Sequence, residues 1–398
     1  EVIDLVCDEC PESGHVVTDL CRGCLAHACE ASCRLNAISF GKDNKAIIDK
    51  SKCVECGQCA KACPYSAINN FIRPCVRSCK ADAIHMAETG EAEIDYEKCV
   101  SCGACVTQCP FGATVDKSYI TNLIDMIKGS EGNTKYKVNA IIAPAFVSQF
   151  DYATIGQVIQ GLRELGFEGI YEAAQGADLV AYYEAKELEE KGFLTTSCCP
   201  AFVEYIEKNF PDLVPNISHN LSPMGTIGKI IKDEDPTCKN IFIGPCTAKK
   251  AEFQLEKVKD YIDCVITFEE LQALFDSKDI DIENLESTPI DDATPFGRGF
   301  AKSGGVAAAV VEALIEQGSD FVPDTVAVEG LDKCKPVLMR ASRGMLKNNL
   351  IEGMACANGC IGGAGCLSHT DKHKVVIDQH AREATHKEIT KVVEGFSK

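Results

Sequence analysis

No uninterrupted run of about 18 apolar residues occurs in the 398-residue sequence, so no membrane-spanning helix is predicted. The first residues, EVIDLVCDEC, lack the basic, apolar and small-residue regions of a secretory signal. They also lack an initiator methionine, from which we expect a chain that is processed or cut from a longer one. Positive charge is scarce, because 40 Lys and Arg stand against 59 Asp and Glu. The resulting net charge of −19 argues against nucleic acid as a partner.

Cysteine is missing from residues 110–197, and this gap divides the chain. Sixteen of the 25 cysteines lie before the gap and nine lie after it. A helical stretch and a polar GSEGN stretch within residues 114–136 predict a linker between one domain over 1–113 and another over 137–398. So many cysteines suit a secreted disulfide scaffold only in a much shorter chain. We therefore expect metal ligands in a reducing compartment, which predicts a cytoplasmic protein.

The second domain alternates between the two main patterns of secondary structure. Short apolar runs predict strands within 138–146, 168–174, 240–246, 263–268 and 324–330. Apolar residues at helical spacing predict helices within 154–166, 177–192, 269–277, 304–318 and 343–350. This alternation predicts an α/β fold with a largely parallel sheet. Cys246 and Cys356 lie in loops that follow strands, where α/β proteins place their ligands.

In the first domain, two stretches repeat the spacing C-x2-C-x2-C-x3-C-P, namely CVECGQCAKACP and CVSCGACVTQCP. This is the bacterial ferredoxin run for 4Fe–4S clusters, in which the fourth cysteine ligates the neighbouring cluster. The spacing disfavours the alternative of a structural zinc site. The ligands of these runs are Cys53, Cys56, Cys59 and Cys63, and Cys99, Cys102, Cys105 and Cys109.

Three irregular motifs hold the other eight cysteines of the first domain. CRGCLAHACEASC is a wider run, CVRSC is a half-run, and CDEC is an isolated pair. If the two fragments complete a fourth set, sixteen thiolates hold four cubane clusters. A zinc knuckle built from the pair and the start of the wider run is the alternative, with three clusters and one zinc. The cysteines are Cys21, Cys24, Cys29 and Cys33 in the wider run, Cys75 and Cys79 in the half-run, and Cys7 and Cys10 in the pair.

The wider run followed by a regular one resembles the multi-cluster ferredoxin subunits of molybdenum oxidoreductases. That resemblance implies an α+β ferredoxin-like domain and a pairing of the cysteines. The implied sets are Cys21, Cys24, Cys29, Cys63; Cys53, Cys56, Cys59, Cys33; Cys99, Cys102, Cys105, Cys79; and Cys7, Cys10, Cys75, Cys109. Such a domain conducts electrons, so a redox centre is expected elsewhere in the chain.

The stretch TTSCCPAF places Cys198 and Cys199 side by side. A disulfide between neighbours is strained, because bridged cysteines prefer Cα atoms farther apart. Two adjacent ligands on one metal are also awkward, because successive side chains diverge. We therefore predict that one thiolate binds a metal and that the other stays a free thiol beside it.

Three motifs of the second domain together resemble the iron-only, or FeFe, hydrogenases. They are TSCCPAF, GPCTAKKAE and EGMACANGCIGGAG, and the resemblance covers roughly residues 137–398. It implies an H-cluster, a 4Fe–4S cubane linked to a diiron unit with CO, cyanide and azadithiolate ligands. The implied cubane ligands are Cys199, Cys246, Cys356 and Cys360, of which Cys360 also bridges to the diiron unit. Cys198 is then the free thiol, and it passes protons to the azadithiolate.

The same resemblance implies the surroundings of the H-cluster. Lys249 pairs with one cyanide, a backbone segment lines the other, and a serine lies near the dithiolate. The surrounding residues are Ala143, Pro144, Ser222, Met224, Gly244, Lys249, Glu252 and Met354. The sequence departs from the usual family motifs at Phe202, Met224, Gly244, Ala364, Gly365 and Cys366, which resembles a divergent, group B-like branch. We expect looser and more apolar surroundings at Gly244 and Met224.

A proton route is also implied by the family resemblance. Glu184 and Glu187 fall at its two glutamates, Ser218 at its serine, and Lys191 where an arginine is usual. The spacing of Glu184, Glu187 and Lys191 places them on one helix face. The alternative is a charged helix face in contact with solvent. For the route, Glu184 needs to be buried with a raised pKa.

The remaining candidate ligands fit no motif. Cys238, Cys264, Cys334 and Cys366 are expected to be plain thiols in the core or at the surface. The tail histidines are irregularly spaced among charged residues, which predicts a solvated helix face. These are His369, His373, His380 and His386.

Together these patterns predict a hydrogenase of an anaerobic organism, catalysing 2H⁺ + 2e⁻ ⇌ H₂. Its expected partners are a ferredoxin-like redox protein and the maturation proteins that build the diiron unit. One alternative is an iron–sulfur assembly factor, but such relatives do not keep the proton cysteine, the cyanide lysine and the bridging motif together. A hydrogen sensor and a pure electron carrier are further alternatives. The carrier would leave the three late motifs unexplained.

Overall fold

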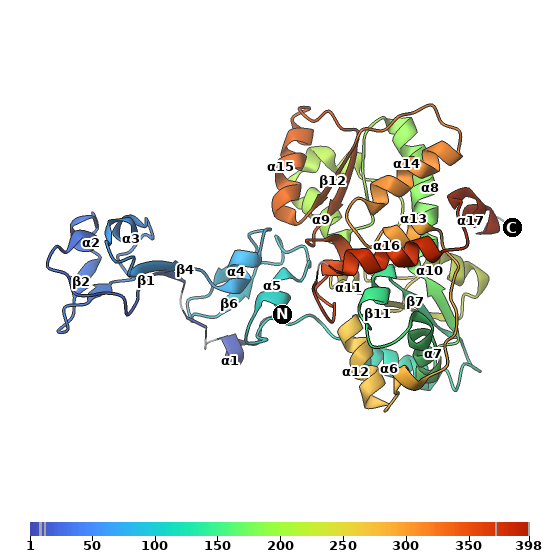
Figure 1. The fold of residues 1–398 in the computed structure, drawn as a ribbon, viewed down its shortest axis with the longest axis horizontal. Coiled ribbons are helices and arrows are strands. Elements are labelled where there is room, and N and C mark those ends of the chain that lie inside the picture. The colour runs from blue at the N-terminus through green and yellow to red at the C-terminus, as the bar shows by residue number, and fades with distance from the viewer. Residues whose placement is uncertain (8–9, 12, 371, 397–398) are drawn as a thin grey trace. The chain divides into compact units, whose positions relative to one another are not determined.

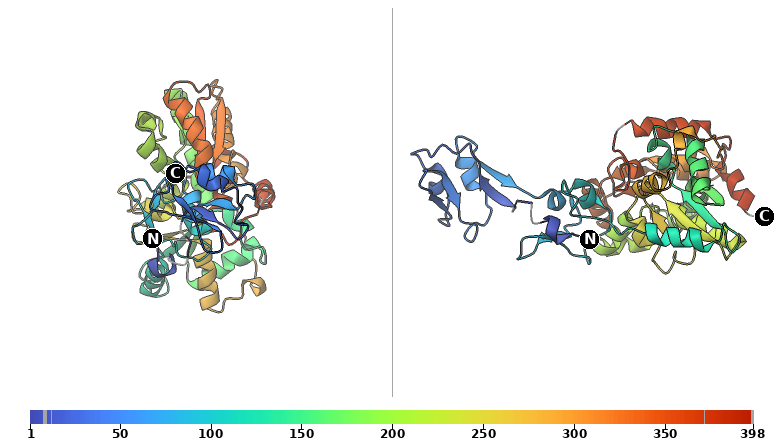
Figure 2. Two further views of the ribbon diagram at one scale, coloured as in Figure 1. Left: turned by 90° about the vertical axis from the view of Figure 1, so that its left-hand side faces the viewer. Right: turned by 90° about the horizontal axis from the view of Figure 1, so that it is seen from below.

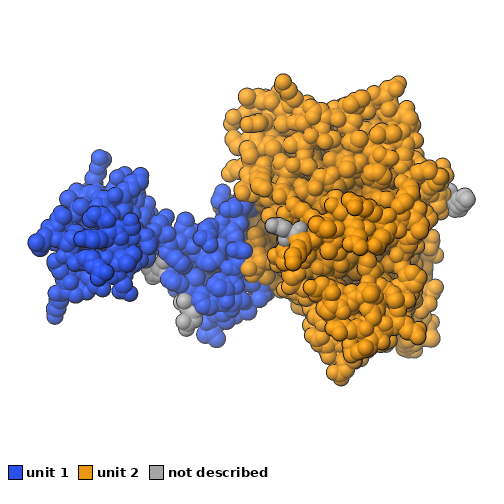
Figure 3. Space-filling model, in the orientation of Figure 1, with its two compact units in different colours: residues 1–95, 108–115 blue, residues 96–107, 116–398 orange. Residues whose placement is uncertain are grey.

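The computed structural model describes residues 1–7, 10–11, 13–370 and 372–396. The chain forms two compact units, shown in different colours in Figure 3. The first contains residues 1–95 and 108–115, and the second contains residues 96–107 and 116–398. No helix among the described residues is long and apolar enough to cross a membrane.

The first unit is built from short antiparallel strand pairs and single-turn helices. Strand β1 (Gly14–Val17) pairs with β4 (Ile68–Phe71), β2 (Ile38–Phe40) with β3 (Ala46–Ile48), and β5 (Ile84–Met86) with β6 (Ala92–Ile94). The helices are α1 (Asp4–Cys7), α2 (Ala28–Ala31), α3 (Gln58–Ala62) and α4 (Pro74–Ser78). One core of this unit has cysteines among its few buried side chains. So small a core needs reinforcement from bound metal.

The second unit contains two parallel sheets. The larger has the strand order β11 (Cys264–Ile266), β10 (Lys239–Ile243), β7 (Val138–Ile142) and β8 (Gly169–Glu172). The smaller has the order β12 (Thr325–Glu329), β13 (Leu350–Met354) and β9 (Leu194–Thr195). Every residue of β7 is buried, as expected for an interior strand covered on both faces. Helices flank these sheets in the views of Figure 1 and Figure 2.

Helix α8 (Ala173–Lys191) packs against several other helices of this unit. Its contacts include α10 (Pro223–Glu234), α13 (Pro295–Gly299), α14 (Gly305–Glu316) and α17 (Ile389–Phe396). Apolar residues of α8 and α14 share one core with the smaller sheet. The remaining helices are α5 (Ala104–Gln108), α6 (Ile120–Gly129), α7 (Ile155–Leu165), α9 (Pro200–Asn209), α11 (Lys249–Glu252), α12 (Phe268–Ser277), α15 (Leu331–Ser342) and α16 (His373–Glu383), with 3-10 turns η1 (Pro144–Ser148), η2 (Pro211–Asn216), η3 (Ile282–Asn284) and η4 (Gly359–Gly362).

Helix boundaries follow local sequence signals. Thr154 begins α7 with a capping box that includes Gln157, and Gly166 ends the helix at a φ of 111°. Thr267 and Glu270 form the same kind of box at the start of α12. The predicted strands and all but one of the predicted helices agree in position with the structure.

The helix predicted over 343–350 is wrong. Helix α15 ends at Ser342, and Gly344 follows it in the left-handed conformation at a φ of 65°. The amides of Gly344 and Met345 then close a Schellman-type end on the carbonyl groups of Ala341 and Arg340. The apolar residues of this stretch therefore belong to a turn and to the start of β13.

Two further expectations need correction. The segment 114–136 is not a free linker, because Tyr119 and Leu123 are buried in the core around the larger sheet. The tail histidines are not uniformly solvated, because His373 and His380 are both buried. His373 has Gln149 and Ser368 as polar partners, and His380 lies 3.6 Å from Glu172. Gln149 and Glu172 come from distant parts of the sequence, which explains why the local pattern misled.

Candidate functional site

The four cysteines predicted to hold the H-cluster gather in the second unit. Cys246 follows β10, Cys356 follows β13, Cys199 directly precedes α9, and Cys360 lies in η4. The first two positions are at the carboxyl ends of parallel strands, where α/β folds place ligands. Three of the four, Cys199, Cys246 and Cys360, line a cavity of about 80 Å³.

The thiols of this group are close enough to influence one another. Burial raises the pKa of each, and the pKa of Cys246 rises to about 12 with Cys199 as a further cause. Burial raises the pKa of Cys356 well above its ordinary value, and Cys246 and Cys199 add to the effect. Such buried thiols become thiolates when a metal cation takes the place of their protons. The donor set therefore fits an iron–sulfur cubane.

Lys249 and Glu252 form a buried ion pair beside these cysteines. The Lys249 ammonium donates to the Glu252 carboxylate at 2.6 Å and to the Cys198 carbonyl group at 3.4 Å. Burial alone would lower the pKa of Lys249, but the nearby Glu252 carboxylate raises it. Lys249 also lines the cavity, so a buried cation faces the space next to the cysteines. An anionic ligand such as cyanide fits this position.

Cys198 lines the same cavity and lies close to Glu184. Burial raises the pKa of Cys198 well above its ordinary value, and the nearby Glu184 carboxylate raises it further. Glu184 is fully buried on α8, and burial raises its pKa to about 7. Its Oε1 accepts hydrogen bonds from the amide and hydroxyl of Ser197, at 3.2 and 3.3 Å. Its Oε2 has no hydrogen-bond partner among the described residues, which leaves it able to carry a proton.

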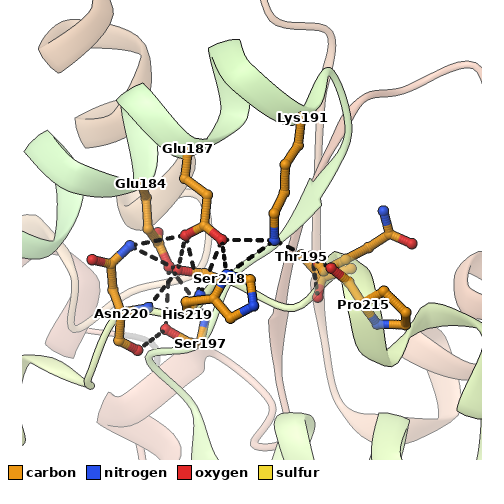
Figure 4. Close-up of polar contacts among 10 residues, drawn as sticks. Glu184, Glu187, Lys191, Thr195, Ser197, Pro215, Ser218, His219 and Asn220 are labelled. Carbon is orange, nitrogen blue, oxygen red and sulfur yellow. Dashed lines mark hydrogen bonds and ion pairs between the residues drawn. The ribbon is translucent and has the colours of Figure 1, made fainter.

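Polar groups continue from Glu184 along the same face of α8 (Figure 4). The Ser218 hydroxyl lies close enough to Glu184 to lower its pKa, and it donates to Glu187 Oε2 at 3.2 Å. Glu187 Oε1 in turn forms a 2.8 Å ion pair with exposed Lys191. Burial would raise the pKa of Glu187, but Lys191 and His219 together lower it. The structure thus brings together all four residues of the predicted route.

Three neighbours of this polar chain were not predicted. Asn220 donates from its side chain to Ser218 and Glu187, at 3.0 and 3.1 Å. His219 Nδ1 lies 2.7 Å from Glu187, and Ser197 holds Glu184 in place. His219 and Asn220 directly follow the predicted Ser218, and Ser197 directly precedes Cys198. Their adjacency in sequence to predicted residues was the only available signal.

The other predicted surroundings fall into two groups. Ala143, Pro144, Met224 and Met354 line the cavity. Ser222 instead caps α10 by accepting the Gly225 amide at 3.4 Å, and its neighbour Pro223 reaches the cavity. Phe202, at the position of the usual tryptophan, is fully buried against Gly353, where any Cβ would lie 2.1 Å from its ring.

The expectation of loose packing at Gly244 is wrong. A Cβ placed on Gly244 would lie 2.6 Å from the Phe242 ring and 3.0 Å from the Ala143 Cβ. Phe242 itself lines the cavity, so its ring occupies the room that a larger residue at position 244 would need. The surroundings are apolar, as predicted, but Phe242 fills them.

Gly244→Met is therefore expected to destabilise the protein by about 1–3 kcal/mol, because overpacking forces Phe242 and Ala143 to move. If the cavity holds a metal group that carries CO and cyanide, the displaced Phe242 ring should also shift the infrared bands of these ligands. Thermal unfolding and infrared spectra of the loaded protein measure both effects. Gly395→Ala in α17 is a control, because no heavy atom lies near its added Cβ. An unchanged melting temperature and spectrum for Gly244→Met would contradict the packing assigned to Phe242.

Eight cysteines of the first unit line two cavities in the predicted sets. Cys21, Cys24, Cys29 and Cys63 line one cavity. Cys33, Cys53, Cys56 and Cys59 line the other. Each set combines three cysteines of one run with the last cysteine of the other, as in two-cluster ferredoxins.

The last cysteine of each run accepts a hydrogen bond from a backbone amide four residues later. The amides belong to buried alanines, and the N–Sγ distances are 3.2–3.4 Å. The pairs are Ala37 with Cys33, Ala67 with Cys63, Ala83 with Cys79, and Ala113 with Cys109. Amide hydrogen bonds to sulfur tune cluster potentials. A repeated C-x3-A spacing was the signal in the sequence.

The zinc alternative receives no support from this geometry. The thiols of Cys7 and Cys10 lie near those of Cys75 and Cys109, as their mutual influence on pKa values shows. Cys21 and Cys24 line a different cavity. Among the described residues, no three His, Cys, Asp or Glu side chains converge as closely as a single metal ion requires. A cubane separates its four ligands more widely.

The loop Cys99–Cys105 is anchored to the second unit, to which it belongs. Lys208, near the end of α9, donates to the carbonyl groups of Cys99 and Tyr96 at 2.6 and 3.2 Å. Thr247 donates to the Ser101 carbonyl group at 2.8 Å. Cys102 lies close enough to Cys356 to raise its pKa. Cys79 belongs to the first unit, so its place in this ligand set stays a prediction.

Comparison with known proteins places this arrangement in a family. The profile described as iron only hydrogenase large subunit, C-terminal domain, matches residues 136–364. The chain belongs to the iron-only hydrogenase family. A 4Fe-4S dicluster domain matches residues 20–67, and a 4Fe-4S double cluster binding domain matches residues 52–112. The predicted family and the order of its two folds are thereby confirmed.

Individual relatives of this family member include enzymes and assembly factors. Iron hydrogenase 1 of Clostridium pasteurianum is 30% identical over 371 residues, which cover 80% of this chain and 64% of that protein. The cytosolic Fe-S cluster assembly factor NAR1 of Kluyveromyces lactis is 32% identical over 174 residues, or 40% of this chain and 37% of that one. The chain thus spans about two thirds or less of these relatives.

The solved structure of a variant of FeFe-hydrogenase HydA1 from Chlamydomonas reinhardtii shares the fold. Its TM-score is 0.58 at 22% identity, and the match covers 71% of this chain and 94% of that one.

Proposed function

We propose that this chain catalyses the reversible reduction of protons, 2H⁺ + 2e⁻ ⇌ H₂, at an H-cluster held by Cys199, Cys246, Cys356 and Cys360. When bound, the H-cluster supplies the metal centre at which protons and electrons combine. The main support is that one buried cavity joins the cysteine ligands, a free thiol and a buried cation, and that a polar chain leads from it to the surface.

The residues of this chain would deliver protons in sequence. Lys191 is exposed, so it holds the outer end of the route in contact with solvent. Glu187 and Ser218 pass the proton inward over hydrogen-bond distances, and Glu184 receives it in a buried place. A carboxyl group whose pKa is about 7 exchanges protons readily at neutral pH. Cys198 then bridges Glu184 and the cavity.

Electrons would reach the site through the loop Cys99–Cys105. Cys102 and Cys356 lie close together, so clusters held by these two cysteines would be neighbours. The anchors from Lys208 and Thr247 keep this separation short. A short distance matters because electron transfer slows steeply as two centres move apart.

The partner that supplies the electrons is proposed to be an acidic, ferredoxin-like carrier. Residues 14–71 contain seven Lys and Arg against five Asp and Glu, although the whole chain has a net charge of −19. Exposed Leu25 and Val54 lie within the cysteine runs of this segment, and Cys56 is also exposed. This segment is less negative than the chain as a whole, and its exposed apolar residues lie beside an accessible cluster, which suits the docking of an acidic protein carrier.

Metal analysis of the fully loaded chain is expected to give about 22 irons and no zinc, from four irons per cubane and two in the diiron unit. The reason is that the cysteine sets of the first unit are arranged for cubanes. About 18 irons with one zinc would instead support the zinc knuckle. Inductively coupled plasma mass spectrometry of anaerobically prepared protein makes this measurement.

The second candidate function is iron–sulfur assembly, which the similarity to NAR1 favours. The presence of Cys198, Lys249 and the chain from Glu184 to Lys191 supports the hydrogenase instead. Infrared spectroscopy of protein made together with the hydrogenase maturation proteins separates the two. Bands of metal-bound CO and cyanide, together with hydrogen evolution, are expected. Their absence after competent maturation would favour the assembly factor.

A further inference from the structure

We infer that Cys7, Cys10, Cys75 and Cys109 hold a 4Fe–4S cluster whose counter-cation is the buried guanidinium of Arg73, and that Arg73 raises the reduction potential of this cluster. The inference rests on the proposed electron relay and names a residue that controls the reduction potential of one of its clusters. Family profiles that match the first unit begin at residue 20, so they do not cover Cys7 and Cys10.

The four cysteines come from distant parts of the first unit. Cys7 ends α1, Cys75 lies in α4, and Cys109 is the last cysteine of the second regular ferredoxin run. Cys7, Cys10 and Cys109 are all near enough to Cys75 to interact with it electrostatically, so the four thiols are neighbours. Backbone amides also donate to two of the sulfurs, from Ala92 to Cys7 and from Ala113 to Cys109, each at 3.2 Å. Amides aimed at sulfur are typical of cluster sites.

Arg73 places its guanidinium against this cysteine group. Its side chain is only 2% exposed. Nη1 lies 3.7 Å from the Cys7 sulfur, and Nη2 donates to the Cys10 carbonyl group at 2.8 Å. Nε donates to the Pro11 carbonyl group at 2.9 Å, which fixes the plane of the guanidinium group. Arg73 precedes Pro74, and the extended conformation required before a proline directs the chain into α4.

The charge of Arg73 explains why it is buried here. A guanidinium removed from water is costly unless an opposite charge compensates it. Among the residues that the structure describes, the acceptors of the Arg73 guanidinium are two neutral carbonyl groups and the Cys7 sulfur. A cubane bound by four thiolates is anionic, so it supplies the missing negative charge.

The same charge makes this cluster easier to reduce. One-electron reduction adds a negative charge to the cluster, and a fixed cation nearby favours that state. Hydrogen bonds to the sulfurs act in the same direction. Loss of the cation should therefore shift the reduction equilibrium towards the oxidised cluster about tenfold, which corresponds to about 59 mV for one electron.

The test is an equilibrium redox titration of full-length, cluster-loaded protein followed by electron paramagnetic resonance. In Arg73→Gln, the reduction potential of one accessory cluster should fall by about 59 mV, which is a tenfold change in its reduction equilibrium. The potentials of the other clusters should stay unchanged. Arg73→Lys, which retains the charge, should move the same signal by less. Arg77→Gln is the matched control, because it removes the same charge from an exposed position of the same helix.

Cys10→Ala assigns the signal to the site. This variant should lose about four irons and the signal that moves in Arg73→Gln. Persistence of that signal, unchanged iron content, or a stoichiometric zinc in the wild type would overturn the inference. So would an Arg73→Gln titration that matches the wild type. If Arg73→Gln loses all its iron, the titration of Arg73→Met, which also removes the charge but keeps a long side chain, decides, and an unshifted signal there refutes the role of Arg73.

These readouts do not depend on hydrogen turnover. A protein with the expected shift but without hydrogen evolution would refute the proposed function and leave the Arg73 site standing. A protein that evolves hydrogen but shows no shift would do the reverse.

Discussion

Replacement of Glu184 by Gln is expected to lower hydrogen turnover by about 10²- to 10⁴-fold, the usual contribution of a positioned acid–base group. Glutamine keeps the size of the side chain and can still accept the Ser197 hydrogen bonds. It cannot gain and lose a proton, so the route from Ser218 to Cys198 is interrupted. The infrared bands of the H-cluster should remain, because Glu184 is not one of its ligands.

The matched control for this change is Glu190→Gln. Glu190 lies on the same helix, but its side chain is exposed. Turnover by this control should equal that of the wild type. A Glu184→Gln protein with near-native turnover would contradict the proton route and show that this face of α8 is an ordinary charged surface.

Stability should also report the buried state of Glu184. Its pKa of about 7 lies above the ordinary value of 4.5, so the folded protein binds more protons than the unfolded chain between these values. The free energy of unfolding of the wild type therefore falls as the pH rises from 4.5 through 7, by up to about 3 kcal/mol from this group. Glu184→Gln lacks this loss. As the pH rises from 5 to 8, the melting temperature of the variant should therefore increase relative to that of the wild type. A difference between the two melting temperatures that does not change with pH would contradict the burial of the carboxyl group.

Cys198→Ala is expected to reduce hydrogen turnover as strongly as Glu184→Gln while the metal site persists. Cys198 lines the cavity and lies next to Glu184, so it is the last group of the proposed route before the cavity. Alanine removes the thiol that passes the proton. Iron content and infrared bands should stay close to those of the wild type, because Cys199, and not Cys198, is the proposed ligand. Parallel measurements of turnover, iron and spectra check this division between the adjacent cysteines.

Cys238→Ala is the control for loss of a buried thiol. Cys238 is fully buried in the core around the larger sheet, where its sulfur lies 3.5 Å from Asn240 Oδ1. It should affect stability and leave turnover per loaded site unchanged. Loss of iron from Cys198→Ala but not from Cys199→Ala would reverse the roles proposed for the pair.

Local patterns carried much of the fold and part of the candidate site. The spacing within each cysteine run places several thiols on one short loop, so the ligand type could be read directly from the sequence. The spacing of the apolar residues likewise predicted the strand β7 and the helices α7 and α8, because the burial of each element leaves its own apolar pattern in the sequence. Cys238, Cys264, Cys334 and Cys366 were expected to be plain thiols in the core or at the surface, and the structure buries all four.

The failures have a common physical origin in packing and pairing contacts that the apolar pattern of the sequence does not record. Residues 343–350 have an apolar pattern that suits a helix, but the last of them, Leu350, belongs to β13 and pairs with β12 and β9. The small side chain at Gly244 suggested free space, but the Phe242 ring fills it. His373 looked solvated among charged neighbours, yet Gln149 from a distant segment meets its ring.

By itself, the sequence determined which family the chain belongs to and which residues are the candidate metal ligands, because short-range spacing encodes ligand geometry. The tertiary structure alone decided which partners surround those residues. Only folding brings Arg73 to Cys7 and Cys10, and Asn220 and His219 to Glu187. Such contacts depend on chain reversals whose outcome is set by the packing of whole units, and no local spacing records them.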